Sequence, residues 1–545
     1  MLFNSLEFII FFLLVYCTYL ALPFRLQNYM LLGASYIFYG WWDVRFLFLV
    51  AISTTVDFWV GLLIENGRLR RNQLIGPACF LGLSAVVFLC LNPKALWTND
   101  QPSLDLASLI RWSVIDWVFA GAVGFLACMY IVYRVLEMLP DPKRRLFCLM
   151  ISVTTQLGLL GVFKYFNFFI ESLSFVLNSI GMETSSLHLN IVLPVGISFY
   201  TFQSLSYTID IYRGQFKPIT RFFDFALFVA YFPQLQAGPI ERARQLIPQI
   251  SKPRQLSFEQ TARGLYLILF GFFKKVAIAD GVAPVVDQIF GSSGRVTWID
   301  VIAGTILFAV QIYCDFSGYT DIARGTSKLL GIDLMINFKQ PYFATNPQEF
   351  WHRWHISLST WLRDYLYITL GGNRGNLAFV CRNIMITMLL GGLWHGAAWN
   401  YVLWGFYQGG LLCVYQVWRH NHEAQKLPSR KPWIAQAAKI LGFFAFVCYG
   451  WLLFRARSFA QIVDFTRLLI TDFGNIDYGA SLPRLSAILG LSLLVPMEII
   501  QYWKDDAHYY QRFPVPLRGL FIAALIVVIL IGMSNEPAQF IYFQF

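Results

Sequence analysis

The stretch that decides the fold is residues 350–408. It reads FWHRWHISLSTWLRDYLYITLGGNRGN (350–376), then a short link ending in Arg382, then NIMITMLLGGLWHGAAWNYVLWGFYQ (383–408). Between residues 383 and 418 there is no Asp, Glu, Lys or Arg, and His395 is the only histidine. An imidazole is costly to place in such an apolar run, so it marks a functional position or the lining of a wet cavity.

The composition around this stretch is that of a membrane protein. Of the 545 residues, 57% are hydrophobic and 13% are charged, whereas a soluble domain carries about 25% charged residues. The mean hydropathy is +0.54, and apolar runs of membrane length recur along the chain. We therefore predict an all-α, polytopic transmembrane helical bundle with re-entrant or interfacial helices, forming a single domain over residues 1–545.

The positive charge of the chain is explained by its topology. The net charge is +11, and the basic residues gather in short loops such as residues 68–71, 143–145 and 419–431, where the positive-inside rule places them. We predict contact with the lipid bilayer and an anionic substrate, and no nucleic-acid binding, because basic and aromatic residues do not alternate on a polar surface. Residues 66–145 begin and end at basic clusters, so the chain leaves the side of the membrane that holds the basic loops and returns to it. These residues are therefore predicted to form an extra transmembrane hairpin within the domain.

No metal site is expected from the cysteines or histidines. The nine cysteines are scattered and no CxxC pair occurs, which excludes a zinc or disulfide framework as the first interpretation. His352 and His355 have a possible ligand spacing, but no carboxylate or thiol follows at a useful distance in the sequence.

The first half of the central stretch predicts a helix with a clear start. Asn346 is suited to the N-cap, Pro347 to the first helical position and Glu349 to the third. At three- and four-residue spacing the expected helix presents one mixed face, made of Trp351, Trp354, His355, Leu358 and Leu362.

The second half is too long for one straight span. As a helix, residues 383–418 would measure roughly 54 Å, against a hydrocarbon core of about 30 Å. The break is expected in GGLWHGAAWN (391–400), where small residues permit a turn or a close backbone approach. His395 would then lie where helices end, and a buried neutral imidazole there can accept a proton from a hydroxyl. A hydrogen-bonded core histidine is the structural alternative.

Other polar residues have two interpretations each. Residues 193–214 are too polar for a lipid-facing helix and predict a buried one. Asp315 and Asp321 could relay protons or cations, but helix-end caps and partners for Lys or Arg are the favoured interpretation. The donor-binding residues are not determined by the sequence, and the candidates are Arg353, Arg363, Asp364 and Arg374.

Several long motifs, in order, resemble the membrane-bound O-acyltransferase family. Besides the two halves of the central stretch they are LPVGISFYTFQSLSYTIDIYRG (193–214), FPQLQAGPIERARQL (232–246), YCDFSGYTDIARG (313–325) and NFKQPYFATNPQEFW (337–351). The resemblance is strongest to the bacterial branch that acetylates alginate, cellulose or peptidoglycan. It implies a bundle around a central tunnel, with His395 as the catalytic histidine and His355 as the second signature histidine. His352 departs from the Arg or Asn expected at its position.

The resemblance also implies a reaction and partners. A cytoplasmic acyl donor, acetyl-CoA, would deliver its acetyl group at the tunnel of a multi-pass protein in the bacterial inner membrane. The acceptor would be an exported polysaccharide, with a periplasmic acetyltransferase of the Ser-His-Asp type completing the transfer. His395 would deprotonate the attacking hydroxyl or carry the acyl group itself, and His355 would orient the donor or relay a proton. The alternatives are an ion-coupled transporter and a non-catalytic scaffold of a polysaccharide-modifying complex.

Overall fold

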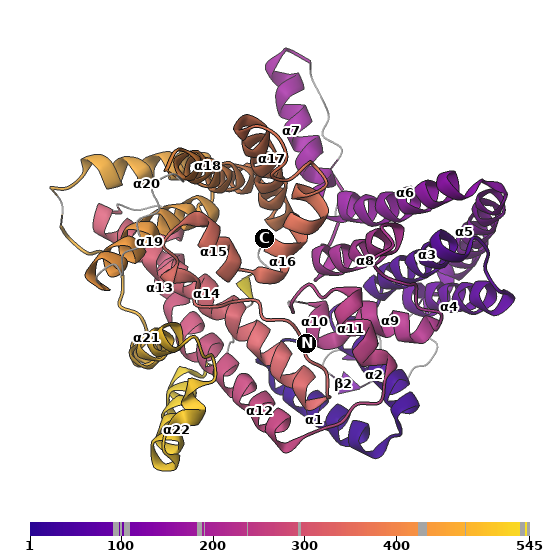
Figure 1. Ribbon diagram of the computed structural model, residues 1–545, viewed down its shortest axis with the longest axis horizontal. Helices are drawn as coiled ribbons and strands as arrows, with labels where there is room; N and C mark the ends of the chain where they lie inside the picture. Colours follow the sequence, from indigo (N-terminus) through magenta and orange to yellow (C-terminus); the bar gives the residue numbers. More distant parts are fainter. Residues whose placement is uncertain are drawn as a thin grey trace. The chain divides into compact units, whose positions relative to one another are not determined.

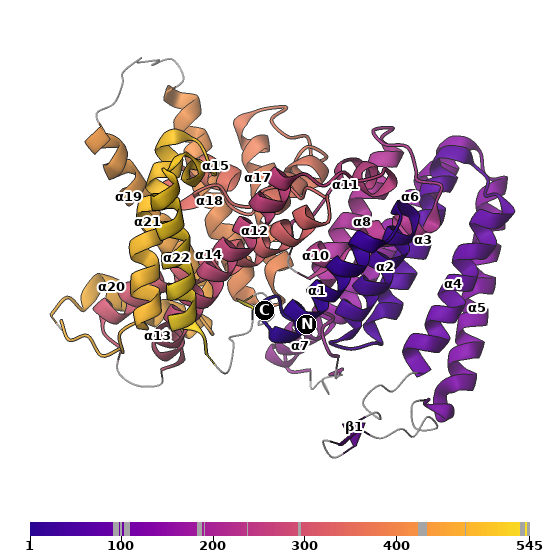
Figure 2. The same ribbon diagram turned by 90° about the horizontal axis from the view of Figure 1, so that it is seen from below.

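The computed structural model of the chain is helical almost throughout (Figures 1 and 2). It describes all residues except 91–96, 99–100, 103–109, 183–187, 190, 237, 293–295, 423–432, 475, 535–539 and 542–545. Most of the loop of the predicted 66–145 hairpin, and the basic link after residue 422, therefore lie outside the described residues. The chain forms two compact units, one mainly Glu7–Ser257 and the other mainly Phe258–Lys328 with Met335–Phe545.

The first unit contains the N-terminal helices and one very short antiparallel strand pair. Its elements are α1 (Leu6–Ala21), α2 (Phe24–Gly40), α3 (Phe46–Asn66), α4 (Arg71–Cys90), β1 (Trp97–Thr98), β2 (Gln101–Pro102), α5 (Trp112–Met138), α6 (Asp141–Leu160), η2 (Gly161–Tyr165), α7 (Phe166–Ser179), α8 (Ile197–Tyr212), α9 (Phe222–Ala230), α10 (Phe232–Leu235) and α11 (Ala243–Ser251).

The second unit contains the central stretch of the sequence. Its elements are α12 (Phe258–Phe272), η3 (Phe273–Ala279), α13 (Asp280–Gly291), α14 (Trp298–Leu329), η4 (Pro341–Phe343), α15 (Pro347–Arg353), α16 (Ile356–Trp361), η5 (Leu362–Tyr367), α17 (Leu377–His395), α18 (Trp399–His422), α19 (Trp433–Arg455), α20 (Phe459–Thr471), α21 (Leu485–Lys504), η6 (Tyr509–Arg512) and α22 (Val515–Gly532).

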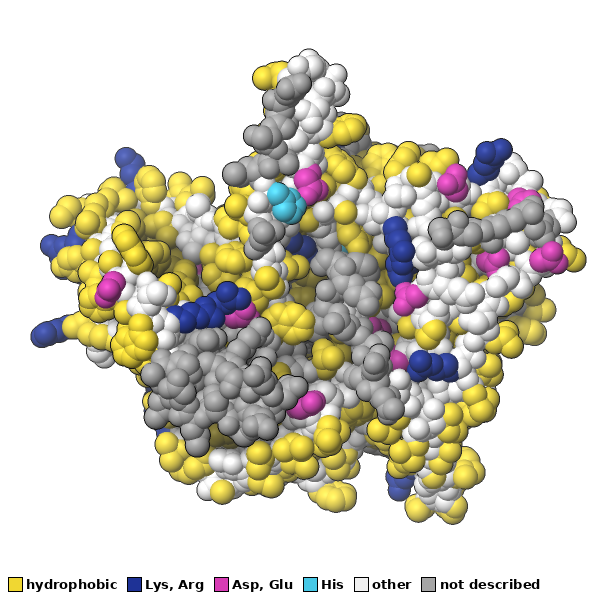
Figure 3. Space-filling view, turned by 180° about the vertical axis from the view of Figure 1, so that it is seen from behind, with side chains coloured by type: hydrophobic (Ala, Val, Ile, Leu, Met, Phe, Trp, Pro, Cys, Tyr) yellow, Lys and Arg dark blue, Asp and Glu magenta, His cyan; other side chains and the backbone are white. Residues whose placement is uncertain are grey.

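The helices confirm the predicted class of fold. In the described part of the chain, nine helices are long and apolar enough to cross a membrane. On the face shown in Figure 3, hydrophobic side chains dominate and charged ones are scattered. Such a surface suits lipid rather than water. The chain is therefore an all-α, multi-pass membrane protein.

The predicted 66–145 hairpin corresponds to α4 and α5. The two helices lie side by side (Figure 2). In α5 only Leu136 is buried, so most of this helix faces outward. That the pair is an addition within a single domain stays a prediction.

Two adjacent lysines in the middle of an apolar run are buried in ion pairs. Lys274 Nζ lies 2.6 Å from Asp321 Oδ2, and Lys275 Nζ lies 2.8 Å from Asp280 Oδ1 and 2.9 Å from Asp315 Oδ1. The interpretation of Asp315 and Asp321 as partners of basic side chains is confirmed, whereas their interpretation as helix-end caps is wrong, because both lie inside α14. Both lysines belong to the π-helix η3, whose wider turn reduces the angle between successive side chains and lets both reach acids on α14.

We expect Lys275→Met to destabilise the protein strongly. Lys275 is 1% exposed, and removing it leaves the carboxylates of Asp280 and Asp315 buried without their cation, at a cost of about 3–5 kcal/mol. The measurement is thermal unfolding of the purified full chain in detergent. The control is Lys339→Met, because Lys339 pairs with Asp505 at 2.9 Å on the exposed surface and its loss should leave the melting temperature almost unchanged. Equal melting temperatures for the two variants would contradict this.

Candidate functional site

The expected break in residues 383–418 lies directly after His395. Helix α17 ends at this histidine, and α18 begins at Trp399. The two helices pack closely because glycines face each other at their contact. A Cβ atom on Gly392 would meet the carbonyl oxygen of Tyr401, and one on Gly405 would meet that of Met388. The small residues therefore serve close backbone approach, as predicted.

The imidazole of His395 is enclosed by aromatic rings. It is 4% exposed, and its ring stands edge-on to those of Trp394, Trp404 and Phe454, with centroid distances of 5.1, 5.0 and 5.5 Å. These walls shield the ring from bulk water. The ring can therefore exchange a proton only with a group that binds beside it, as a general base does with its substrate.

His355 does not lie on a continuous helix, so the expectation of one helical face from Trp351 to Leu362 is wrong. Helix α15 ends at Arg353, and His355 adopts a left-handed conformation with φ of 43° before α16 begins. The cause is Asn337, which lies far back in the sequence. Its carbonyl oxygen accepts from the backbone N–H of Ile356 at 2.9 Å, and its side-chain Oδ1 accepts from the N–H of Ser357 at 3.1 Å.

The same asparagine fixes the His355 ring. Nδ1 of His355 lies 3.2 Å from Asn337 Oδ1, and the side chain is fully buried. Burial lowers the pKa of His355 to about 3, so this imidazole is neutral near pH 7. A ring held in this way suits positioning better than proton delivery.

One indole joins the two signature histidines. The Trp394 ring lies 5.9 Å from His355 and 5.1 Å from His395, measured between ring centroids. On its other side His355 meets Phe316 at 4.7 Å. The structure thus brings the two predicted site residues to one aromatic cluster, although they are far apart in the sequence.

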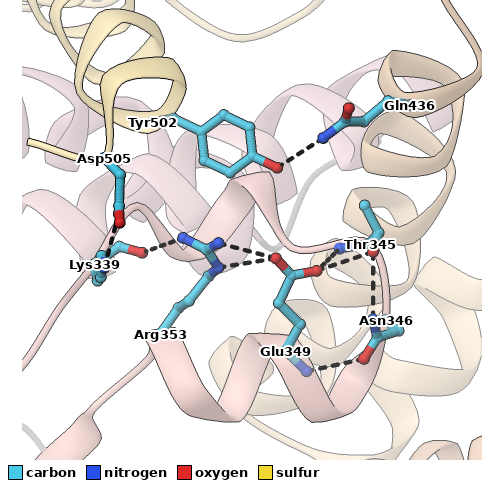
Figure 4. Close-up of polar contacts among 8 residues, drawn as sticks. All are labelled: Lys339, Thr345, Asn346, Glu349, Arg353, Gln436, Tyr502 and Asp505. Carbon is cyan, nitrogen blue, oxygen red and sulfur yellow. Dashed lines mark hydrogen bonds and ion pairs between the residues drawn. The ribbon is translucent and has the colours of Figure 1, made fainter. Parts of the chain in front are cut away.

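Among the candidates for donor binding, Arg353 already makes contacts that stabilise the protein itself. Its guanidinium lies 3.0 Å from Glu349 and donates to the backbone carbonyl of Lys339 at 3.2 Å (Figure 4). Glu349 accepts from Thr345, and Asn346 caps α15 as predicted, accepting from the N–H of Glu349 at 2.9 Å. This network ties the first turn of α15 to the preceding loop.

Arg363 instead lines a cavity of about 310 Å³. Its Nε donates to Asp364 at 2.8 Å, while Arg374 is exposed and is not among the lining residues. The cavity also has His352 and Arg419 on its wall. Its further lining residues are Gln348, Trp351, Ile356, Ser359, Thr360, Leu362, Tyr367, Asn373, Ile384, Thr387, Met388, Leu412, Tyr415 and Gln416.

Arg419 is the lining residue that sequence reasoning missed. It was grouped with the basic loop, but it belongs to the last turn of α18 and donates to Gln348 at 3.2 Å. Helical spacing is the sequence signal that could have identified Arg419. One helix face contains Leu412, Tyr415, Gln416 and Arg419. Two guanidinium groups and an imidazole on one wall suit an anionic ligand.

The cavity lies along the same helix as His395. Met388 lines it and precedes His395 by seven residues, or two turns, which is roughly 10 Å along α17. Trp351 also lines it and packs against Trp404 at 5.9 Å, and Trp404 packs against His395. Neither histidine is among the residues that line this cavity, and the central tunnel stays a prediction.

Helix α18 separates Arg419 from His395. Trp399 and Trp418 lie near its two ends and are 65% and 54% exposed. They are separated by 19 residues, roughly 28 Å of helix, although α18 is not among the nine helices of the described part of the chain that are long and apolar enough to cross a membrane. Arg419 lies in the last turn of α18, and the break after His395 lies directly before its first turn.

A family model described as MBOAT, the membrane-bound O-acyltransferase family, matches residues 215–454. A probable alginate O-acetylase AlgI from Azotobacter vinelandii is 37% identical over the whole of both chains. A peptidoglycan O-acetyltransferase from Helicobacter pylori is 34% identical over 70% of this chain and 75% of its own length. A teichoic acid D-alanyltransferase from Bacillus subtilis is 28% identical over 50% of this chain and 70% of its own length.

The chain therefore belongs to the membrane-bound O-acyltransferase family. It is an enzyme that transfers an acyl group from a donor to a hydroxyl. Among the described residues no group of three or more His, Cys, Asp or Glu side chains could hold a metal ion.

The left-handed backbone at His355 makes a testable prediction. Neither His355→Gly nor His355→Ala retains the imidazole, but only glycine adopts φ of 43° without strain. We expect the glycine variant to be more stable by about 1 kcal/mol, measured by thermal unfolding in detergent. The control pair is Ser359→Gly and Ser359→Ala within α16, where alanine should be the more stable. The same order at both positions would show that His355 is not left-handed in solution.

Proposed function

We propose that the protein transfers an acetyl group from acetyl-CoA, bound on the basic side of the bacterial inner membrane, toward a hydroxyl of an exported polysaccharide. The observation that supports this most is the position of His395. It ends α17 inside an aromatic enclosure, two helical turns from a cavity with arginines on its wall. The relatives named for alginate and peptidoglycan acetylation support the acetyl group and the class of acceptor.

His395 acts as the general base in this proposal. Its neutral imidazole takes the proton of the attacking hydroxyl while that oxygen forms a bond to the thioester carbonyl carbon. The tetrahedral intermediate then breaks its carbon–sulfur bond, and the leaving thiolate recovers the proton from the imidazolium. The products are an acetyl ester and CoA thiol, so no proton is gained or lost overall. His355 is a positioning residue that holds the shared Trp394 indole in place.

The cavity on the basic side binds the donor in this proposal. CoA carries phosphates at one end and the thioester at the end of a flexible arm. Arg363 and Arg419 line the cavity near the interface, and phosphates are the anions that guanidinium groups bind best. His352 lies on the same wall and adds a donor. The arm would then follow α17 toward His395.

A separate protein completes the modification in this proposal. In this proposal the break after His395, at the end of α18 away from Arg419, faces the periplasm, where an acetyltransferase of the Ser-His-Asp type accepts the group and passes it to the polymer. The alternative of an ion-coupled carrier relied on Asp315 and Asp321 as a relay. Their ion pairs with Lys275 and Lys274 favour a structural role instead.

Replacing His395 with Ala should lower O-acetylation of the exported polysaccharide at least about a hundredfold, because a general base contributes 10²–10⁴-fold. The measurement is ester-bound acetate on the polymer from cells that carry the variant, with the level of protein in the membrane checked alongside. His420→Ala is the control, since this exposed histidine near the end of α18 lies outside the enclosure. Normal acetylation by the His395→Ala protein would reject the proposal.

Replacing Arg419 with Ala should raise KM for acetyl-CoA by roughly tenfold with kcat nearly unchanged, because a charge-assisted contact to a phosphate is lost. Initial rates of CoA release by the purified enzyme measure this. Arg374→Ala is the matched control, since Arg374 is exposed and does not line the cavity. An unchanged KM, or an equal change in both variants, would place the donor elsewhere.

A further inference from the structure

The first unit contains a buried polar cluster that plays no part in the proposed reaction. Three helices each contribute two side chains spaced four residues apart, so that all six face a common point. Each of the six residues is fully buried. We call them the Asp57 cluster: Ser53 and Asp57 of α3, Ser152 and Gln156 of α6, and Ser204 and Thr208 of α8.

The carboxylate of Asp57 is at the centre of the cluster. Its Oδ1 accepts from the hydroxyl of Ser152 at 2.7 Å, and its Oδ2 accepts from Nε2 of Gln156 at 2.8 Å. Ser204 is a third hydrogen-bonding neighbour of this carboxylate. All three of these partners are neutral groups.

The remaining contacts close the cluster. Ser152 and Thr208 hydroxyls lie 2.9 Å apart, and those of Ser53 and Ser204 lie 3.3 Å apart. Gln156 Nε2 also donates to Ser53 Oγ at 2.6 Å. Hydroxyl and carboxylate oxygens and the amide nitrogen of Gln156, contributed by three helices, thus gather within hydrogen-bonding distance of one another.

An ionised Asp57 has no ion-pair partner in this environment. It lies near the middle of α3, a membrane-length helix that is 89% buried over its apolar window. No Lys, Arg or His is among the groups that interact with its carboxylate in the described part of the chain. A single negative charge at such a depth is expensive unless a positive centre meets it.

The side-chain amide oxygen of Gln156 is a further indication of a positive centre in the cluster. Its Oε1 is buried and has no hydrogen-bond partner among the described residues. The orientation of an amide is an assignment, but turning it over would place this oxygen 2.8 Å from Oδ2 of Asp57. Two acceptors would then face each other, and a proton on the carboxyl or a positive centre beside it would be needed to relieve their repulsion. Thr201 Oγ1, on the same face of α8 as Ser204, is likewise buried without a partner among these residues.

We propose that the Asp57 cluster binds a monovalent metal cation, with Na⁺ as the ion that fits it. Its candidate ligands are all oxygens, which hard cations prefer. One carboxylate balances one positive charge. Binding would join α3, α6 and α8 at the centre of the first unit, and so stabilise that unit. This goes beyond the proposed acyl transfer and does not depend on it.

The test is thermal unfolding of the purified full chain in detergent. It compares NaCl, KCl and choline chloride at equal ionic strength. We expect the melting temperature to be higher in NaCl by about 2–4 °C and to saturate with sodium concentration, because a ligand that binds only the folded state stabilises it. Asp57→Asn should remove the sodium dependence. Asp224→Asn is the matched control, since Asp224 is a buried carboxylate of the same unit that accepts from Asn28 at 3.0 Å.

A direct measurement keeps the test decisive if Asp57→Asn does not fold. Retention of radioactive ²²Na⁺ by the wild-type protein should be displaced by unlabelled Na⁺ and not by choline. Ser204→Ala, which removes one candidate ligand, should raise the half-saturating sodium concentration several-fold. Equal melting temperatures in the three salts, or no displaceable sodium, would overturn the proposal and leave Asp57 as a neutral, hydrogen-bonded carboxyl. Both readouts are independent of acetyl transfer.

Discussion

The constraint on which the rest of the structure depends is that a charge inside lipid must be neutralised by the protein itself. In the second unit this role belongs to Lys274 and Lys275, which join η3 to α14 through Asp321 and Asp315, while Lys275 also pairs with Asp280 of α13. The packing of this unit therefore includes a fixed electrostatic contact as well as apolar surface. His395, His355 and the two lysines all lie where a helix ends, begins or widens.

Local signals explain why much of this could be predicted from the sequence. Composition alone defined the class of fold, and the glycines around His395 located the break between α17 and α18. The cap at Asn346 was also readable, because a capping box is complete within four residues. Each of these features depends on neighbours along the chain.

Features that depend on distant residues could not be predicted in this way. The left-handed turn at His355 depends on Asn337, which is eighteen residues away. No periodicity within residues 347–362 carries that information, so a continuous helix was the natural expectation. Arg419 was overlooked for the same reason, because its partner Gln348 belongs to another helix, α15.

The position of the break between α17 and α18 has a consequence for how far the acyl donor must reach during transfer. Arg419 lies in the last turn of α18, whereas the enclosed imidazole of His395 ends α17 directly before α18 begins. In the proposed reaction, a thioester whose phosphates are held beside Arg419 must therefore reach along these helices on its own tether. The length of the donor's arm then sets which donors can serve.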